Sequence, residues 1–234
     1  MEAIVLAGGM GTRLQSVVKD VPKPMAAIKD KPFLYHVLTH LQRFSIEKII
    51  LSVGYKSEVI QSYFGNQFKG TPIEYAIEQE PLGTGGAIFM ALQKINTEHV
   101  FITNGDTFFN VDITAFKKFH LTEVADVSMC LRSLPDISRY GTVRINETHQ
   151  IIGFEEKQGL HQPGTINAGS YIFNAKKMRA LPHPQKFSIE KDFFEKNLKT
   201  LYFAGFVTND YFIDIGIPED YARAQKELED ITTR

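Results

Sequence analysis

Residues 3–14 read AIVLAGGMGTRL, and this stretch sets the interpretation of the whole chain. Residues 3–7 are a short, continuous apolar run, which is typical of a strand buried on both faces of a parallel sheet. Glycines at positions 8, 9 and 11 follow directly. Such glycines let the backbone approach a polyphosphate, whose charge is met by free N–H groups. The spacing fits neither the P-loop nor the dinucleotide pattern, and for the glycines alone a simple tight turn is an equal alternative.

Two basic residues accompany the glycines. Arg13 lies inside the loop, where a guanidinium can bind two phosphate oxygens at once. Lys23 stands between Pro22 and Pro24, and the stiffened backbone would present its ammonium in a fixed direction. The alternative is a pair of solvated charges beside a turn. The residues favour a phosphate-binding loop with two cations.

Strand and helix patterns alternate along the first half of the chain. Continuous apolar runs predict strands, and apolar stripes at helical spacing predict helices. In chain order we expect a strand at 3–7, a helix at 33–44, a strand at 48–55, a helix after 57, a strand at 73–77, a helix at 87–95 and a strand at 99–103. This order predicts a Rossmann-like, doubly wound α/β fold, in which ligands bind at the carboxyl ends of the strands.

The second half has shorter strands and more turn residues. We expect strands at 126–132, 141–145, 151–156, 165–173, 201–207 and 211–213, with helices at 188–197 and 218–229. No repeat, low-complexity segment or linker divides the sequence. We therefore expect one domain over residues 1–234, built on a mostly parallel mixed sheet flanked by helices. Its nucleotide-binding half would cover about 1–110, and a more antiparallel substrate-binding half would cover about 111–234.

Composition limits the functional classes. The 234 residues carry 26 Lys and Arg against 27 Asp and Glu, and the net charge of −1 gives no overall field to attract nucleic acid or an anionic membrane. No apolar run approaches the ~18 residues of a membrane span, and the N-terminus lacks signal-peptide features. The single cysteine, Cys130, excludes an internal disulfide. We expect a cytoplasmic protein. The sequence is also compatible with a homodimer.

Six segments, in order, resemble the sugar-phosphate nucleotidyltransferases, which transfer a nucleotidyl group from an NTP to a sugar 1-phosphate. The segments are LAGGMGTRL at 6–14 with PKPM at 22–25, PLGTGGA at 81–87, NGD at 104–106, EEK at 155–157, NAG at 167–169 and FIDIG at 212–216. Together they span nearly the whole chain. The resemblance implies Mg²⁺ as cofactor, small-molecule substrates and a sugar-phosphate-binding second half.

The resemblance also implies which residues form the site. Those implied to bind the nucleotide, with Gln79 at the base edge, are Leu6, Ala7, Gly8, Gly9, Gly11, Thr12, Arg13, Lys23, Gln79, Gly83, Thr84, Gly85, Asn104 and Gly105. Those implied to bind the sugar phosphate are Gly141, Glu156, Lys157, Asn167 and Gly169. The implied catalytic residues are Arg13, Lys23, Asp106, Lys157 and Asp214, of which Asp106 and Asp214 would hold the metal.

The reaction class explains why these residue types are needed. A sugar-phosphate oxygen attacks the α-phosphorus and pyrophosphate leaves, so catalysis consists of neutralising charge and positioning the reactants. Two carboxylates, Asp106 and Asp214, can hold one Mg²⁺ between nucleotide and sugar phosphate. No enzyme nucleophile is required, so Cys130 is expected in the core. His36 and His40 have a zinc-compatible spacing but no third ligand nearby, which disfavours a zinc site.

The residues alone leave the substrates open. Residues 15–26 (QSVVKDVPKPMA) and the LGTGGA loop are similar to the D-glycero-α-D-manno-heptose 1-phosphate guanylyltransferases, which make GDP-heptose for bacterial capsules and other surface glycans. This similarity implies GMP transfer from GTP to the heptose phosphate. The alternatives are mannose 1-phosphate with GTP, glucose or amino-sugar 1-phosphates with UTP or dTTP, and an inactive nucleotide-sugar sensor. A glycosyltransferase is disfavoured because Phe108 leaves no Asp-x-Asp motif.

Overall fold

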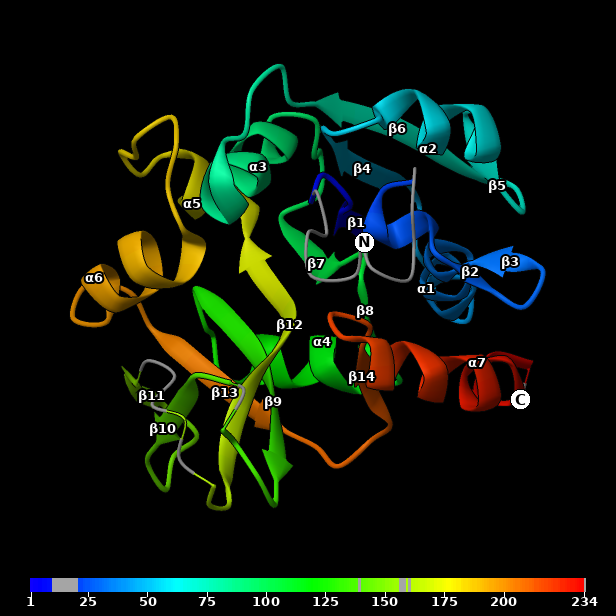
Figure 1. The fold of residues 1–234 in the computed structure, drawn as a ribbon. Coiled ribbons are helices and arrows are strands. Elements are labelled where there is room, and N and C mark those ends of the chain that lie inside the picture. The colour runs from blue at the N-terminus through cyan, green and yellow to red at the C-terminus, as the bar shows by residue number, and fades with distance from the viewer. Residues whose placement is uncertain (10–20, 139, 156–158, 160, 234) are drawn as a thin grey trace.

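The structure is a computed structural model, and it describes residues 1–9, 21–138, 140–155, 159 and 161–233 (Figure 1). A ten-stranded mixed sheet forms its centre, in the order β11-β10-β12-β7-β1-β4-β6-β5, with β9 paired to β12 and β13 paired to β9. Helices cover both faces of this sheet, as the α/β prediction requires. None of the helices in the described ranges combines the length and apolarity that a membrane span needs.

The first half is the predicted parallel part of the sheet. Its main strands are β1 (Glu2–Leu6), β4 (Ile49–Val53), β6 (Thr71–Ile77) and β7 (His99–Asn104). β1 runs parallel to both β4 and β7, and β4 runs parallel to β6. Every residue of β4 is buried, because helices cover both faces of these central strands. The continuous apolar runs therefore predicted these buried strands correctly.

The second half supplies the predicted, more antiparallel part, in which only the β13–β9 pair among the described strands is parallel. Its strands are β9 (Val127–Leu134), β10 (Thr142–Ile145), β11 (Ile151–Glu155), β12 (Gly164–Asn174) and β13 (Phe203–Val207). β12 pairs antiparallel with β7, β9 and β10, so it joins the two halves in one sheet. A register shift interrupts the β12–β9 pairing between Asn167 and Tyr171. β8 (Thr107–Phe109) and β14 (Phe212–Asp214) form a separate antiparallel pair.

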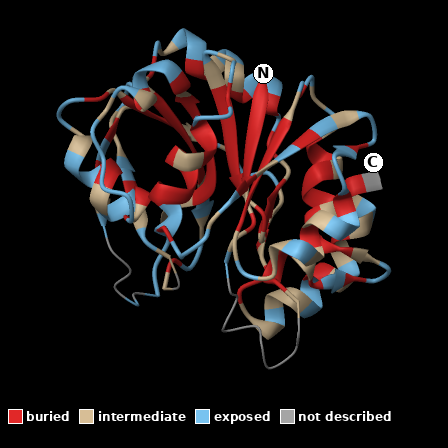
Figure 2. Ribbon diagram, turned by 90° about the horizontal axis from the view of Figure 1, so that it is seen from above, coloured by how far each residue is buried: buried red, intermediate tan, exposed pale blue. Residues whose placement is uncertain are grey.

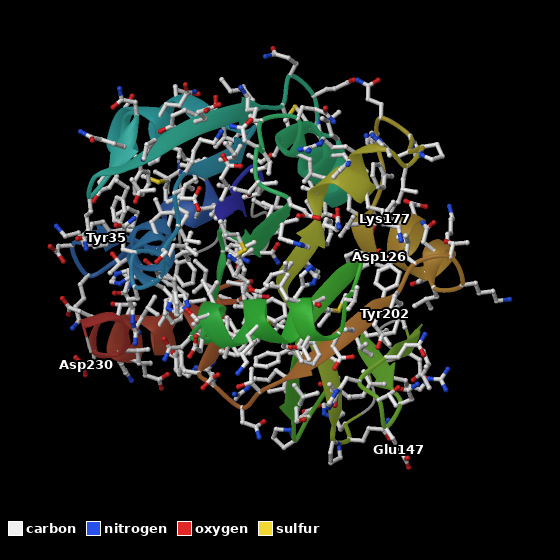
Figure 3. The ribbon with its side chains drawn as sticks, turned by 180° about the vertical axis from the view of Figure 1, so that it is seen from behind. Tyr35, Asp126, Glu147, Lys177, Tyr202 and Asp230 are labelled. Carbon is white, nitrogen blue, oxygen red and sulfur yellow. The ribbon has the colours of Figure 1, made fainter. Side chains whose placement is uncertain are left out.

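One partly buried acid, Asp126, connects three segments of this half. Asp126, just before β9, accepts a hydrogen bond of 2.6 Å from Lys177 Nζ and one of 2.9 Å from the backbone N–H of Tyr202 (Figure 3). Lys177 belongs to α5 (Ala175–Arg179), and Tyr202 directly precedes β13. The carboxylate therefore joins three segments that are far apart in the sequence.

The helices form two layers around the sheet (Figure 2). Alternate residues of β1 reach different cores, Ala3 and Val5 on one face and Ile4 on the other. The first core includes residues of α1 (Phe33–Leu41), α2 (Ser57–Phe64), α4 (Ile113–Thr122) and α7 (Pro218–Thr233). The second includes residues of α3 (Gly83–Leu92), α5 and the π-helical turn η3 (Ile189–Phe194). The remaining short elements are η2 (Lys23–Met25), β2 (Ala27–Ile28), β3 (Lys31–Pro32), β5 (Gln67–Phe68) and α6 (Glu195–Asn197).

The sequence analysis did not predict α4 and α5, and two of the helices that it did predict differ in the structure. α3 begins at Gly83 rather than at residue 87, so the glycines form its first turn instead of a loop before it. The helix expected at 188–197 is the π-helical turn η3 followed by the single turn of α6. Apolar spacing indicates that a segment is helical, but it does not distinguish the wider π turn from an α-helix.

The histidines of α1 are core residues rather than metal ligands. His36 Nδ1 lies 3.0 Å from Thr232 Oγ1, and His40 Nε2 lies 3.1 Å from the carbonyl oxygen of Val111. A carbonyl only accepts, so His40 donates from Nε2 and keeps Nδ1 as a buried nitrogen without a partner among the described residues. Burial lowers the pKa of His40 to about 4. Burial, with His99 nearby, lowers the pKa of His120 to about 4 as well.

These histidines predict acid sensitivity of the fold. In the unfolded chain a histidine binds its proton near pH 6.5, whereas folded His40 and His120 bind theirs only near pH 4. The free energy of unfolding should therefore fall as the pH drops below 6.5, by on the order of 2 kcal/mol for each histidine at pH 5. Urea denaturation at pH 7 and pH 5 measures this loss. His40→Asn should reduce the loss, and exposed His183→Asn should not; equal losses in all three proteins would contradict the assignment.

Candidate active site

A cleft of about 570 Å³ opens at the carboxyl ends of the parallel strands. Its volume is that of an ordinary small-molecule site, and its position is where doubly wound sheets bind ligands. Segments that follow β1, β4, β6 and β7 all reach it, together with the first turn of α3. The lining residues are Leu6, Gly8, Gly9, Ser52, Gly54, Tyr55, Glu78, Gln79, Glu80, Pro81, Gly83, Thr84, Ala87, Asn104 and Asp106.

Seven of the residues implied to bind the nucleotide line this cleft: Leu6, Gly8, Gly9, Gln79, Gly83, Thr84 and Asn104. Ala7 and Gly105 instead hold the strand ends together, because Ala7 N–H donates to Ser52 O and Gly105 N–H donates to Leu6 O. Five implied residues lie outside the described residues: Gly11, Thr12, Arg13, Glu156 and Lys157.

Glu78 forms part of the cleft wall beside Gln79, and the sequence analysis did not single it out. A Cβ atom added to Gly8 would lie 2.6 Å from Glu78 Oε1 and 3.3 Å from the backbone nitrogen of Gly54, so a side chain at residue 8 would displace the Glu78 carboxylate and crowd Gly54. Glu78 Oε2 accepts a 3.1 Å hydrogen bond from Leu82 N–H. Burial raises the pKa of this carboxyl, although the hydrogen bond from Leu82 works in the opposite direction.

The glycine run at the start of α3 serves two different purposes. Gly83 has a φ of +73° and lines the cleft with Thr84. Gly85 packs away from it: its N–H donates to Phe187 O over 3.0 Å, and an added Cβ would lie 2.2 Å from the Phe187 ring. Gly85 was implied to bind the nucleotide, but its amide already has a partner here. Gly83 and Gly85 therefore both leave room for the segment at Phe187, and Gly83 also lines the cleft with Thr84.

Two carboxylates converge on one lysine at the edge of the cleft. Asp106 follows β7, and Asp214 ends β14. The antiparallel register pairs Asp214 with Thr107, which brings the two aspartates together. Lys23 Nζ donates to Asp106 Oδ2 over 2.8 Å and to Asp214 Oδ1 over 2.9 Å. Burial alone would lower the pKa of Lys23, but the carboxylates outweigh it and raise that pKa, so the lysine is protonated.

This carboxylate pair has the chemistry of a magnesium site. Mg²⁺ is commonly bound through one or two carboxylates, substrate phosphates and waters rather than by a full protein cage. Asp106 and Asp214 keep 33% and 25% of their side chains exposed, so oxygens of both can reach a ligand in the cleft. Among the described residues no group of three or more acids, histidines or cysteines could hold a metal by itself. The residues thus fit a metal that arrives with a nucleotide.

The residues implied to bind the sugar phosphate border the same region. Gly169 in β12 has a φ of +72°, and an added Cβ would lie 2.5 Å from Asn104 Nδ2, so β12 closely approaches the cleft wall there. Asn167 Oδ1 accepts from Gly169 N–H over 2.9 Å. Gly141 directly precedes β10, whose first residue pairs with Ile166 of β12. The described members of this set therefore gather around one end of β12.

Comparison with known proteins identifies the family to which the chain belongs. The model of the nucleotidyl transferase family matches residues 2–231, and the chain belongs to this family. Its curated relatives include the D-glycero-alpha-D-manno-heptose 1-phosphate guanylyltransferase of Aneurinibacillus thermoaerophilus, which is 49% identical over 98% of this chain and 99% of its own length. The enzyme of the same description from Campylobacter jejuni is 46% identical over 94% of this chain and 97% of its own length.

Solved structures agree with this family. The crystal structure of HddC from Yersinia pseudotuberculosis complexed with GMP-PN has a TM-score of 0.86 and 40% identity, and the match covers 97% of this chain and 98% of that one. The inositol-1-phosphate CTP transferase from T. maritima, with a TM-score of 0.79 and 21% identity, shares the fold. The Rossmann-like, mostly parallel fold expected from the sequence is thereby confirmed.

Proposed function

We propose that this protein transfers GMP from GTP to D-glycero-α-D-manno-heptose 1-phosphate, giving GDP-heptose and pyrophosphate. Two relatives of that description, 49% and 46% identical over nearly their whole length, support the substrate pair. The observation that carries the proposal is the meeting of the Lys23, Asp106 and Asp214 charges at the edge of a cleft of nucleotide size.

The reaction needs no protein nucleophile. A phosphate oxygen of the sugar 1-phosphate forms a bond to the α-phosphorus of GTP, and the bond from that phosphorus to the α–β bridging oxygen breaks, so pyrophosphate leaves with the electron pair. Cys130 is fully buried, and burial raises the pKa of its thiol well above the usual value, so it takes no part. Catalysis therefore depends on charge and alignment.

The described residues suit that task. Lys23 is held by two carboxylates in a fixed position, so its positive charge needs no reorganisation during the reaction. Asp106 and Asp214 would hold Mg²⁺, which would neutralise phosphate charge when bound. Arg13 and Lys157, which lie outside the described residues, are proposed to contact the triphosphate and the sugar phosphate respectively. The nucleotide would occupy the half at about 1–110, and the sugar phosphate the half at about 111–234.

Glu78 supports guanine as the base. The Watson–Crick edge of guanine presents two adjacent donors, N1–H and the N2 amino group, and a carboxylate accepts from both at once. Uracil and thymine present one donor between two acceptors, and adenine presents a donor beside an acceptor. Glu78 lines the cleft, and its Oε1 lies over Gly8 at the end of β1. We therefore assign base selection to Glu78.

Pyrophosphate release with Mg²⁺ tests the proposal. Purified protein is assayed with GTP, UTP, CTP, dTTP and ATP against heptose, mannose, glucose and N-acetylglucosamine 1-phosphates. The proposal expects the highest kcat/KM for GTP with the manno-heptose phosphate. A higher value for another pair would keep the reaction class and overturn the substrates. Absence of release with every pair, from folded protein that binds GTP, would favour a nucleotide-sugar sensor.

A further inference from the structure

Glu190 occupies a junction between the two parts of the site. It lies on η3, whose first residue, Ile189, donates its N–H to Thr84 Oγ1 over 3.0 Å. Thr84 lines the nucleotide cleft. Toward the other half, Glu190 Oε1 accepts a 2.9 Å hydrogen bond from Asn167 Nδ2 on β12. η3 is therefore attached to the nucleotide cleft at one residue and to the sugar-phosphate strand at the next.

The amide of Asn167 has no hydrogen left for a substrate. Its NH₂ group carries two hydrogens. One is donated to Tyr171 Oη over 2.8 Å and the other to Glu190 Oε1 over 2.9 Å. Its Oδ1 accepts from Gly169 N–H. Three hydrogen bonds thus fix the Asn167 side chain. Such a side chain is suited to positioning a neighbouring residue and has no donor left for sugar hydroxyls.

Glu190 has the capacity that Asn167 lacks. A carboxylate has about four acceptor positions, and the described residues supply one hydrogen bond, from Asn167. Its side chain remains open to solvent, whereas its neighbours Ile189 and Phe193 are buried in the core. Partial desolvation by neighbouring residues raises the pKa of its carboxyl, although the hydrogen bond from Asn167 acts in the opposite direction. Glu190 is therefore a fixed, accessible acceptor with vacant lone pairs.

The location of this acceptor matches the sugar side of the reaction. Asn167 holds Gly169, and Gly169 lies against Asn104, which lines the cleft two residues before Asp106. A sugar phosphate that attacks a nucleotide near Asp106 and Asp214 must place its ring beside this part of β12. Ring hydroxyls are donors, and a carboxylate can accept from two neighbouring hydroxyls at once.

We propose that Glu190 accepts hydrogen bonds from hydroxyl groups of the sugar 1-phosphate, with Asn167 as its positioning residue. This inference rests on the proposed transferase function and adds a specificity-determining contact to it. This contact would favour sugar 1-phosphates that carry a hydroxyl at the contacted ring position over those that lack it. Glu190 is not among the residues that line the nucleotide cleft, so its loss should leave the affinity for GTP intact.

Glu190→Gln tests the acceptor directly. The Gln carbonyl can still accept from Asn167, so the local structure is kept, but its NH₂ donates where the carboxylate accepted. We expect the KM for the sugar 1-phosphate to rise roughly 10- to 100-fold, with less than a twofold change in the KM for GTP. Glu195→Gln, an exposed residue of the same segment, removes the same charge and is the matched control. An unchanged sugar KM in Glu190→Gln would overturn the proposal, and so would an equal rise of both KM values.

Deoxy analogues give a readout that a structural role would not produce. The 2-, 3-, 4- and 6-deoxy forms of the accepted sugar 1-phosphate are compared in the wild-type and Glu190→Ala proteins. For the contacted hydroxyl, the wild-type protein should lose roughly 10-fold in kcat/KM and the variant should lose almost nothing further. Equal losses in both proteins at every position would refute the contact. If mannose 1-phosphate is accepted and the heptose phosphate is not, the substrate proposal fails, and the same comparison still decides Glu190.

Discussion

Asp106→Asn should lower kcat for pyrophosphate release by about 10²- to 10³-fold, the range for losing one preorganised group that stabilises transition-state charge. The asparagine keeps the shape of the side chain and can still accept from Lys23 Nζ, which lies 2.8 Å from Asp106 Oδ2. It removes one of the two carboxylate charges available to Mg²⁺. The concentration of Mg²⁺ needed for half-maximal activity should therefore rise. Initial rates across a Mg²⁺ titration measure both effects.

Stability must be measured beside activity. Lys23 keeps Asp214 at 2.9 Å, so we expect Asp106→Asn to change the free energy of unfolding by no more than about 1 kcal/mol. Asp112→Asn is the matched control, because Asp112 Oδ1 only accepts from Ala115 N–H at the start of α4 and asparagine can do the same. Undiminished kcat in Asp106→Asn would remove this residue from the mechanism, and a loss explained by unfolding would give it a structural role.

The sequence predicted the parallel half of the fold well because those strands are buried on both faces. β4 is buried at every residue, and a run such as Ile49–Val53 leaves little choice besides a central strand. The antiparallel half was also predicted, although its pairings were not. Register depends on which strands meet, as with the β12 irregularity between Asn167 and Tyr171, and no local pattern carries that information.

The sequence singled out individual candidate residues of the site, but it did not predict which of them lie in contact. Asp106 and Asp214 could be singled out, but only the pairing of β8 with β14 brings them to one lysine. Gly85 could be recognised as part of a glycine run, but its contact with the Phe187 ring depends on a segment more than a hundred residues away. Glu190 had no signal at all, because an acid in a helical segment is normally solvated.

One residue separates the predicted base contact from the one that the fold favours. β6 ends at Ile77, and the next carboxylate, Glu78, is half-buried beside Gly8, whereas Gln79 is exposed at the cleft. Alternation tells which side of a strand a residue occupies, but it fails where the strand ends and the backbone turns. Mutation can decide which of the two residues selects the base.

Glu78→Gln should lower kcat/KM for GTP by roughly 10²-fold, because one acceptor of the carboxylate becomes a donor that faces a guanine donor. The new amide offers one donor and one acceptor, which complements N3–H and a carbonyl of uracil. The kcat/KM for UTP should therefore stay constant or rise, and the GTP preference over UTP should fall by at least the same factor. Gln79→Ala, one residue away in the same cleft, should leave that preference unchanged. If Gln79→Ala abolishes the preference while Glu78→Gln retains it, base selection belongs to Gln79. Because both variants are assayed with the same sugar phosphate and Mg²⁺, a change confined to the ratio of nucleotides reports on the base alone.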